Sequence, residues 1–155
     1  DRVAHCFSDN SPYDLILRQA ETMAGAVPVT INWQVDNEDR VIYKVTASRA
    51  KIIFYDEGFA EKIESMRHAL KGKTLLPINL LATFAPAALH DLPRLGYADE
   101  KAISFTSGTT GRPKGVMLSH RSYLANRLTF EPTQAHAMQQ QIVRIGFVGL
   151  RVGGG

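Results

Sequence analysis

The sequence predicts an α/β fold in which helices flank a largely parallel sheet. Short apolar or β-branched runs alternate with amphipathic segments over roughly the first 80 residues, a pattern typical of parallel strands joined by crossover helices. The 155 residues suffice for one domain with a substantial core. Hydrophobic residues make up 45% of the chain and charged residues 21%, the balance of an ordinary globular protein.

The first strand is expected at 2–7, in "RVAHCF". A helix should follow, because Ser11 is a suitable N-cap and Pro12 fits the first helical position. Gly25 should end this helix. Apolar residues recur at helical spacing at Tyr13, Ile16, Leu17, Ala20, Met23 and Ala24.

The next strand is expected at 26–32, which is rich in β-branched residues. Residues 36–48 are ambiguous, since their apolar residues alternate as in a strand while Asp36 and Asp39 resemble the N-terminal cap of a helix. We predict a helix there, because a strand must follow at 51–56 and parallel strands need a crossover.

The clearest helix is predicted at 59–70, where Phe59, Ile63, Met66 and Leu70 share one face and Gly72 follows. Residues 73–81 contain a further strand candidate, and 82–100 have the mixed polarity and prolines of a connecting loop. Met23, Met66 and Met117 are expected in the core.

Two more strands, 101–105 and 115–119, are expected on either side of the loop "TSGTTGRPKG", with Ser119 capping a final helix. Glycines at 108, 111 and 115 permit positive φ and a close approach of the main chain to a ligand. Successive backbone N–H groups, hydroxyl side chains and Lys114 would together suit a polyphosphate. The Walker pattern is not met, and the alternative is a glycine-rich surface hairpin with an exposed lysine.

The stretch "FTSGTTGRPKGVMLSH" resembles the signature of the adenylate-forming (AMP-binding) superfamily, which includes acyl-CoA synthetases, luciferases and peptide-synthetase adenylation domains. Every fixed position of that signature matches from Phe105 to Val116. The upstream "DRVAHCFSDNSPYDLILRQAETMAGAVPVTIN" and "AKIIFYD" are also similar to this family, and the "GAVPVTIN" turn is most like that of fatty-acid or aryl-CoA ligases. The resemblance covers residues 1–128, a partial AMP-binding domain with its phosphate loop at 105–116, whereas 129–155 match poorly.

The resemblance implies an ATP- and Mg²⁺-dependent ligase of the kind found in fatty acid metabolism. Such enzymes convert a carboxylic acid to an acyl-adenylate, which then passes its acyl group to a thiol, commonly coenzyme A. Carried over by position, the expected phosphate contacts are Thr106, Ser107, Gly108, Thr109, Thr110, Gly111 and Lys114, with Lys114 in the catalytic role.

The family's adenine, ribose and Mg²⁺ segments and its catalytic C-terminal domain have no counterpart in the sequence. We therefore expect an N-terminal portion of such a ligase that does not catalyse adenylation alone and self-associates through exposed core surface. The alternative is a noncatalytic nucleotide-binding or interaction fragment.

Composition limits the remaining functions. A net charge of +3 without a basic block does not favour nucleic acid, and no stretch is apolar over the length of a membrane span. Cys6 is the only cysteine, which excludes an intrachain disulfide and fits a reducing, cytoplasmic location. His5, beside Cys6 on a predicted buried strand, is expected to be a core residue rather than a metal ligand, and no metal site is expected.

Overall fold

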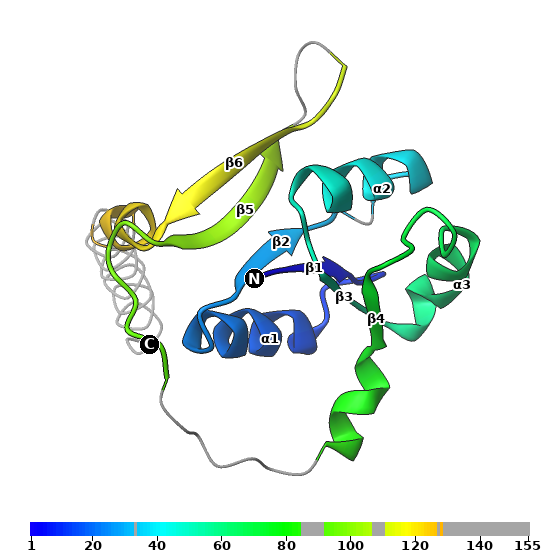
Figure 1. Cartoon of the computed structure of the whole chain (residues 1–155), viewed down its shortest axis with the longest axis horizontal. Helices are drawn as coiled ribbons and strands as arrows, with labels where there is room; N and C mark the ends of the chain where they lie inside the picture. The colour runs from blue at the N-terminus through cyan, green and yellow to red at the C-terminus, as the bar shows by residue number, and fades with distance from the viewer. Residues whose placement is uncertain (33, 85–91, 107–110, 127, 129–155) are drawn as a thin grey trace, which may run out of the picture. The chain divides into compact units, whose positions relative to one another are not determined.

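The computed structural model describes residues 1–32, 34–84, 92–106, 111–126 and 128. Within these residues one sheet has the strand order β4–β3–β1–β2–β5–β6 (Figure 1). Its strands are β1 (Arg2–Cys6), β2 (Val27–Thr30), β3 (Ile52–Tyr55), β4 (Thr74–Pro77), β5 (Glu100–Thr106) and β6 (Lys114–Ser119). The helices are α1 (Pro12–Met23), α2 (Glu38–Ala47), α3 (Glu57–Ser65) and the 3₁₀ helix η1 (Ile78–Thr83).

The sheet is parallel except at one edge. β1 pairs in parallel with both β2 and β3, β3 with β4, and β2 with β5. β5 and β6 are antiparallel, because they are the two arms of a hairpin. The predicted α/β fold with a largely parallel sheet is confirmed, and the ambiguous segment 36–48 contains a helix, α2.

Each α-helix begins at a polar N-cap. Ser11 caps α1 by accepting a hydrogen bond from the Tyr13 backbone N–H at 3.3 Å. The cap of α2 is Asn37, whose side chain accepts from the Arg40 N–H, and neither Asp36 nor Asp39 has that role. Asp56 caps α3 by accepting from the Phe59 N–H at 3.0 Å.

The helices cover opposite faces of the sheet, with α1 on one face and α2 and α3 on the other (Figure 1). The apolar core lies mainly between the strands and the α2–α3 side. It consists of Ala4, Cys6, Val27, Val29, Ile31, Val41, Val45, Ala50, Ile53, Phe59, Ile63, Met66, Leu70 and Ile103. The four residues expected on one face at 59–70 are therefore all buried, although α3 itself ends at Ser65 and turns continue to Gly72.

The apolar stripe predicted on α1 is mostly exposed. Leu17 is buried, but Ile16 is 58% exposed, and Tyr13 and Met23 are about half exposed. The stripe of α1 that packs on the sheet includes Leu17 and Glu21 instead. Met117 on β6 is also exposed, so of the three methionines expected in the core only Met66 lies there.

The chain divides into two compact units, residues 1–120 and 121–155. The sheet belongs to the first unit. The described part of the second unit, 121–126 and 128, is helical, as expected for the chain after Ser119. Among the described residues, no helix has both the length and the apolar character needed to cross a bilayer.

Candidate functional site

The glycine-rich motif lies at the turn of the β5–β6 hairpin. β5 and β6 pair up to Thr106 and Lys114, and the Thr106 hydroxyl lies 3.5 Å from the Lys114 carbonyl oxygen. Three of the seven expected phosphate contacts, Thr106, Gly111 and Lys114, are described by the structure. The other four, Ser107, Gly108, Thr109 and Thr110, lie outside the described residues.

Two glycines of this hairpin have different physical surroundings. Gly111 has φ +102°, a backbone conformation that other residues adopt only with strain, while a Cβ there would meet no atom within 4 Å. Gly115 lies opposite Phe105, and a Cβ at Gly115 would come within 3.2 Å of the Phe105 ring. Gly111 therefore permits the turn, and Gly115 makes room for the aromatic residue that begins the motif.

Helix α2 contacts both arms of the hairpin. The Lys44 ammonium lies 5.4 Å from the centre of the Phe105 ring on the incoming arm. On the outgoing arm, the Arg112 guanidinium lies 5.5 Å from the centre of the Tyr43 ring, and Pro113 is buried. Cation–π contacts of this kind, together with a buried proline, hold the base of the hairpin against the helix.

A buried ion pair fixes Lys44 beneath Phe105. Lys44 pairs with Asp36, and both side chains are almost completely buried. Asp36 also accepts a hydrogen bond from the Asn32 backbone N–H at 2.8 Å, and its own carbonyl accepts from Lys62. These contacts connect the end of β2 to α2 and so to the start of the motif.

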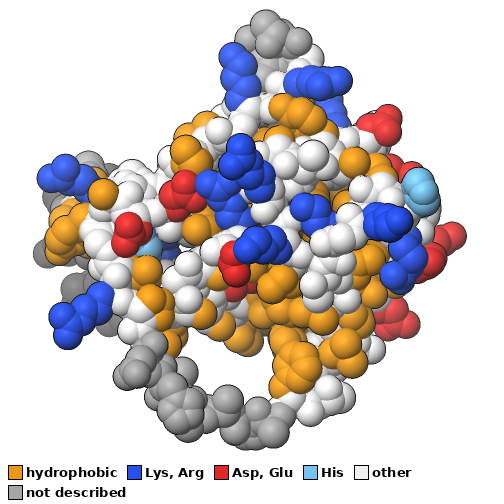
Figure 2. Space-filling model, viewed as in Figure 1, with side chains coloured by type: hydrophobic (Ala, Val, Ile, Leu, Met, Phe, Trp, Pro, Cys, Tyr) orange, Lys and Arg blue, Asp and Glu red, His pale blue; other side chains and the backbone are white. Residues whose placement is uncertain are grey.

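The outgoing arm and α2 enclose a shallow pocket of about 380 Å³. Its lining consists of Asp39, Arg40, Tyr43, Gly111, Arg112 and Pro113. Arg112 and Lys114 are both exposed, and Figure 2 shows basic side chains at the tip of this hairpin. Exposed cations beside a glycine with positive φ form a surface that can attract an anion.

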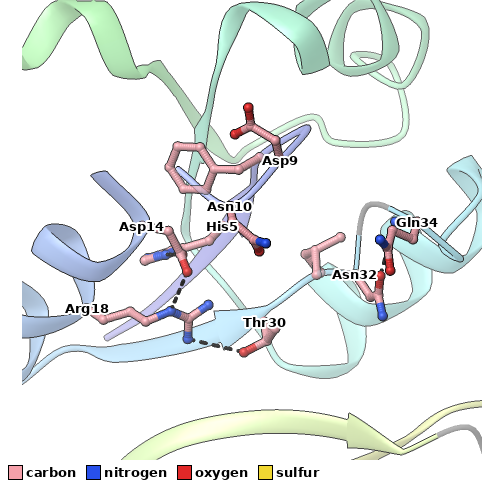
Figure 3. A pocket seen from close by; sticks show the side chains of 10 residues that line it. His5, Asp9, Asn10, Asp14, Arg18, Thr30, Asn32 and Gln34 are labelled. Atoms are coloured by element: carbon pink, nitrogen blue, oxygen red, sulfur yellow. Dashed lines mark hydrogen bonds and ion pairs between the residues drawn. The ribbon is translucent and has the colours of Figure 1, made fainter. Parts of the chain in front are cut away.

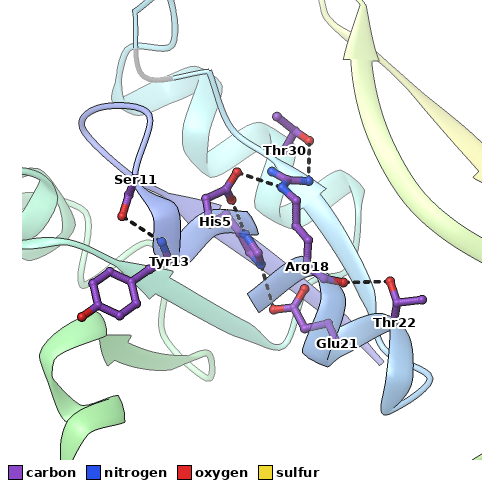
Figure 4. Close-up of polar contacts among 8 residues, drawn as sticks. His5, Ser11, Tyr13, Arg18, Glu21, Thr22 and Thr30 are labelled. Carbon is purple, nitrogen blue, oxygen red and sulfur yellow. Dashed lines mark hydrogen bonds and ion pairs between the residues drawn. The ribbon is translucent and has the colours of Figure 1, made fainter. Parts of the chain in front are cut away.

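A second polar cluster lies beneath α1, on the other face of the sheet (Figure 4). His5 is 2% exposed, and each of its ring nitrogens faces a carboxylate: Nδ1 lies 2.5 Å from Asp14 and Nε2 lies 2.8 Å from Glu21. Burial lowers the pKa of His5, but hydrogen bonds to Asp14 and Glu21 outweigh it, so the pKa is raised above 6.5. This arrangement favours the imidazolium form of His5, in which both ring nitrogens donate to carboxylate oxygens.

The prediction that His5 is a core residue is confirmed, but its two carboxylate partners were missed. A signal existed, since Asp14, Arg18 and Glu21 recur at helical spacing on α1. Cys6, the neighbour of His5, points into the apolar core, and burial raises the pKa of its thiol to about 12. Cys6 is therefore protonated near neutral pH and is not poised to act as a nucleophile.

Among the residues that the structure describes, no group of three or more His, Cys, Asp or Glu side chains is arranged to hold a metal ion.

Comparison with protein families gives a match over most of the chain. The family model described as "AMP-binding enzyme" matches residues 1–148. The mitochondrial malonate–CoA ligase ACSF3 of Mus musculus is 30% identical over 135 residues, which cover 81% of this chain and 22% of the mouse enzyme.

Solved structures give the same result. ATP-bound MatB from Rhodopseudomonas palustris aligns with a TM-score of 0.70 and 32% identity over 83% of this chain and 26% of MatB. A fatty acyl CoA synthetase from Mycobacterium tuberculosis aligns with a TM-score of 0.66 and 28% identity over 77% of this chain and 24% of the synthetase. The chain thus spans about a quarter of the length of these relatives.

Proposed function

The chain belongs to the AMP-binding enzyme family, and on that premise we propose that it carries the ATP phosphate-binding loop of an AMP-forming ligase that joins a carboxylic acid to coenzyme A. One observation carries the proposal. The motif that matches in full from Phe105 to Val116 occupies a β-hairpin turn in which Gly111 has positive φ and Lys114 is exposed. These are the properties of a loop that approaches phosphate oxygens with its main chain and adds one mobile positive charge.

The proposed reaction begins with attack of the acid on the α-phosphate of ATP, which forms an acyl-adenylate and releases pyrophosphate. Negative charge accumulates on the β- and γ-phosphates as pyrophosphate leaves. Lys114 and the N–H and hydroxyl groups of 106–111 would stabilise that charge, and preorganised donors of this kind strengthen their contacts in the transition state. Coenzyme A would then accept the acyl group.

The residues of the phosphate loop are compatible with ATP that binds as its Mg²⁺ complex. Mg²⁺ is commonly bound by substrate phosphates with one or two carboxylates, so the loop itself needs no dedicated cage of acidic residues. When bound, Mg²⁺ would offset part of the phosphate charge. Lys114 would share that role from the protein side, and α2 would hold the loop through Tyr43 and Lys44.

The experiment that tests this proposal is calorimetry of the chain with Mg²⁺–ATP and with pyrophosphate. A few hydrogen bonds and one lysine should give weak binding, with Kd on the order of 1 mM. Lys114→Ala should weaken binding by about tenfold, the usual cost of one charged hydrogen bond. Lys73→Ala is the matched control, because Lys73 precedes β4 at the opposite edge of the sheet.

Equal loss of affinity in the two lysine variants would contradict the proposal. Pyrophosphate exchange with a panel of carboxylic acids should stay at background for this chain, since the expected adenine, ribose and Mg²⁺ contacts of the family are not in its sequence. In a full-length ligase that contains this segment, Lys114→Ala should lower the rate of adenylation by about 10²–10³. Unchanged pyrophosphate release there would refute the role of Lys114.

A further inference from the structure

The carboxyl ends of β1 and β2 form a crevice that is separate from the glycine-rich motif. From β1 the chain enters α1 on one face of the sheet, and from β2 it enters α2 on the other face (Figure 1). The carboxyl ends of β1 and β2 lie next to each other, and the segments that follow the two strands line the same space. A pocket of about 310 Å³ occupies this position, and no described residue of the motif lines it (Figure 3).

The pocket is lined by polar side chains from three segments. Asn10 follows β1, and Asp14 and Arg18 lie on α1. Thr30 is the last residue of β2, and Asn32 follows that strand. Figure 3 shows the Arg18 guanidinium between Asp14 and Thr30. Its Nε donates to Asp14 at 2.9 Å and its Nη1 donates to the Thr30 hydroxyl at 3.1 Å.

Several donors in this pocket are left without a partner among the described residues. Arg18 Nη2 has none, and the Thr30 hydroxyl accepts from Arg18 but keeps its own proton to donate. The Asn32 side-chain oxygen accepts from the Gln34 backbone N–H, which leaves the Asn32 amide N–H groups available. The wall formed by Arg18, Thr30 and Asn32 is therefore rich in donors.

The cluster beneath α1 holds this wall in place. Asp14 is shared between Arg18 and the buried His5, and the second ring nitrogen of His5 is bound by Glu21 (Figure 4). The contact with Asp14 holds the Arg18 side chain in place before a ligand binds, which lowers the entropic cost of binding. Arg18 offsets the charge of Asp14, and the imidazolium form of His5 offsets the charge of Glu21, so in that form these four groups present no net negative charge to a bound anion.

We propose that this crevice binds the carboxylate group of a small organic acid. A planar carboxylate matches the planar fork of an arginine, and the remaining oxygen lone pairs can accept from Thr30 and Asn32. The volume is at the small end of the range for ligand pockets, which limits the acid to a short chain. Asp9 is exposed and also lines the pocket, so the charged end of the acid lies against Arg18 and away from Asp9.

The test is a titration of the ¹⁵N-labelled chain followed by NMR, without nucleotide. Acetate and lactate are the probes, inorganic phosphate is a separate arm, and sodium chloride keeps the ionic strength equal. Saturable shifts are expected for the backbone amides of Thr30 and Asn32 and for the Arg18 Nε–H with the two carboxylates. Arg18→Gln should weaken carboxylate binding by about tenfold or more, because it removes the charged donor.

Two further variants make the result decisive. Thr30→Val keeps the shape of the side chain and leaves the Arg18–Asp14 pair intact, so it tests the site even if Arg18→Gln does not fold; it should weaken binding by about threefold to tenfold. Arg67→Gln is the matched control, since Arg67 lies in the turn after α3, where it pairs with Glu64, and its substitution should leave binding unchanged. The proposal is overturned by an absence of saturable carboxylate shifts, by phosphate binding as well as acetate, or by equal losses in Arg67→Gln and Thr30→Val.

Discussion

Replacing His5 with leucine should lower the free energy of unfolding by about 3–5 kcal/mol, the cost of removing one partner from a buried ion pair. The cost falls on Glu21. Its side chain is 8% exposed, its Oε1 loses the bond to His5, and its Oε2 already has no partner among the described residues. Asp14 contributes less to the loss, because it is 31% exposed and keeps its contact with Arg18.

A double variant distinguishes the cost of leaving the buried Glu21 side chain without its partner from the cost of lost packing at His5. His5→Leu with Glu21→Leu replaces the pair by apolar side chains of similar volume, and such replacements of buried ion pairs are often neutral or stabilising. The double variant should therefore recover most of the stability that His5→Leu loses. The coupling between the two sites follows from a double-mutant cycle that includes Glu21→Leu alone.

Urea unfolding followed by circular dichroism measures these effects. A loss of about 3–5 kcal/mol is a large share of the 5–15 kcal/mol typical of a native domain, so the transition midpoint should fall clearly. His68→Leu is the control, because His68 is exposed, and it should change stability by no more than about 0.5 kcal/mol. If the double variant is as unstable as His5→Leu alone, the ion pair is not the source of the loss and the reasoning is refuted.

Five further predictions concern the same cluster and other parts of the molecule. The raised pKa of His5 means that its stabilising contribution is complete below about pH 6.5 and is lost as pH rises through the folded-state value, and urea midpoints across this range should show it. Burial raises the pKa of Asp14, but hydrogen bonds to His5 and Arg18 lower it to about 2, so its contribution is complete above about pH 4 and is lost as pH falls towards 2. Gly111→Ala should cost about 1–2 kcal/mol through strain at its positive φ and weaken pyrophosphate binding, whereas Gly96→Ala should do neither. Asp56→Ala should destabilise the chain by about 1–2 kcal/mol in thermal unfolding, because α3 loses its N-cap. Sedimentation velocity should detect concentration-dependent self-association through the apolar side chains of β6 at the sheet edge, and a single monomer peak at high concentration would contradict this.

Much of the secondary structure was predictable because its signals are local. Ser11 followed by Pro12 is a helix start that depends only on neighbouring backbone N–H groups, and the structure has that cap. The buried face at Phe59, Ile63 and Met66 was likewise visible from spacing alone. The strand–helix alternation then favoured parallel pairing, since parallel strands need a crossover connection, which is usually a helix.

The buried face of α1 was not predictable in the same way. Two stripes on this helix have helical spacing, an apolar one through Ile16 and a polar one through Asp14, Arg18 and Glu21. Periodicity cannot tell which of two stripes packs on a sheet. The polar stripe packs there because His5 points from β1 towards α1 and pairs with both carboxylates.

The sequence by itself determined the family, the chemical character of the glycine-rich motif and the order of the elements. Each of these depends on residue types at short, fixed spacing along the chain. Only the tertiary structure decided what the motif rests on and where a second pocket lies. Tyr43 reaches Arg112, and His5 reaches Glu21, across separations that no local pattern encodes. The physical reason is that strand order and the faces taken by the helices, which arise from packing of the whole sheet, bring these side chains together.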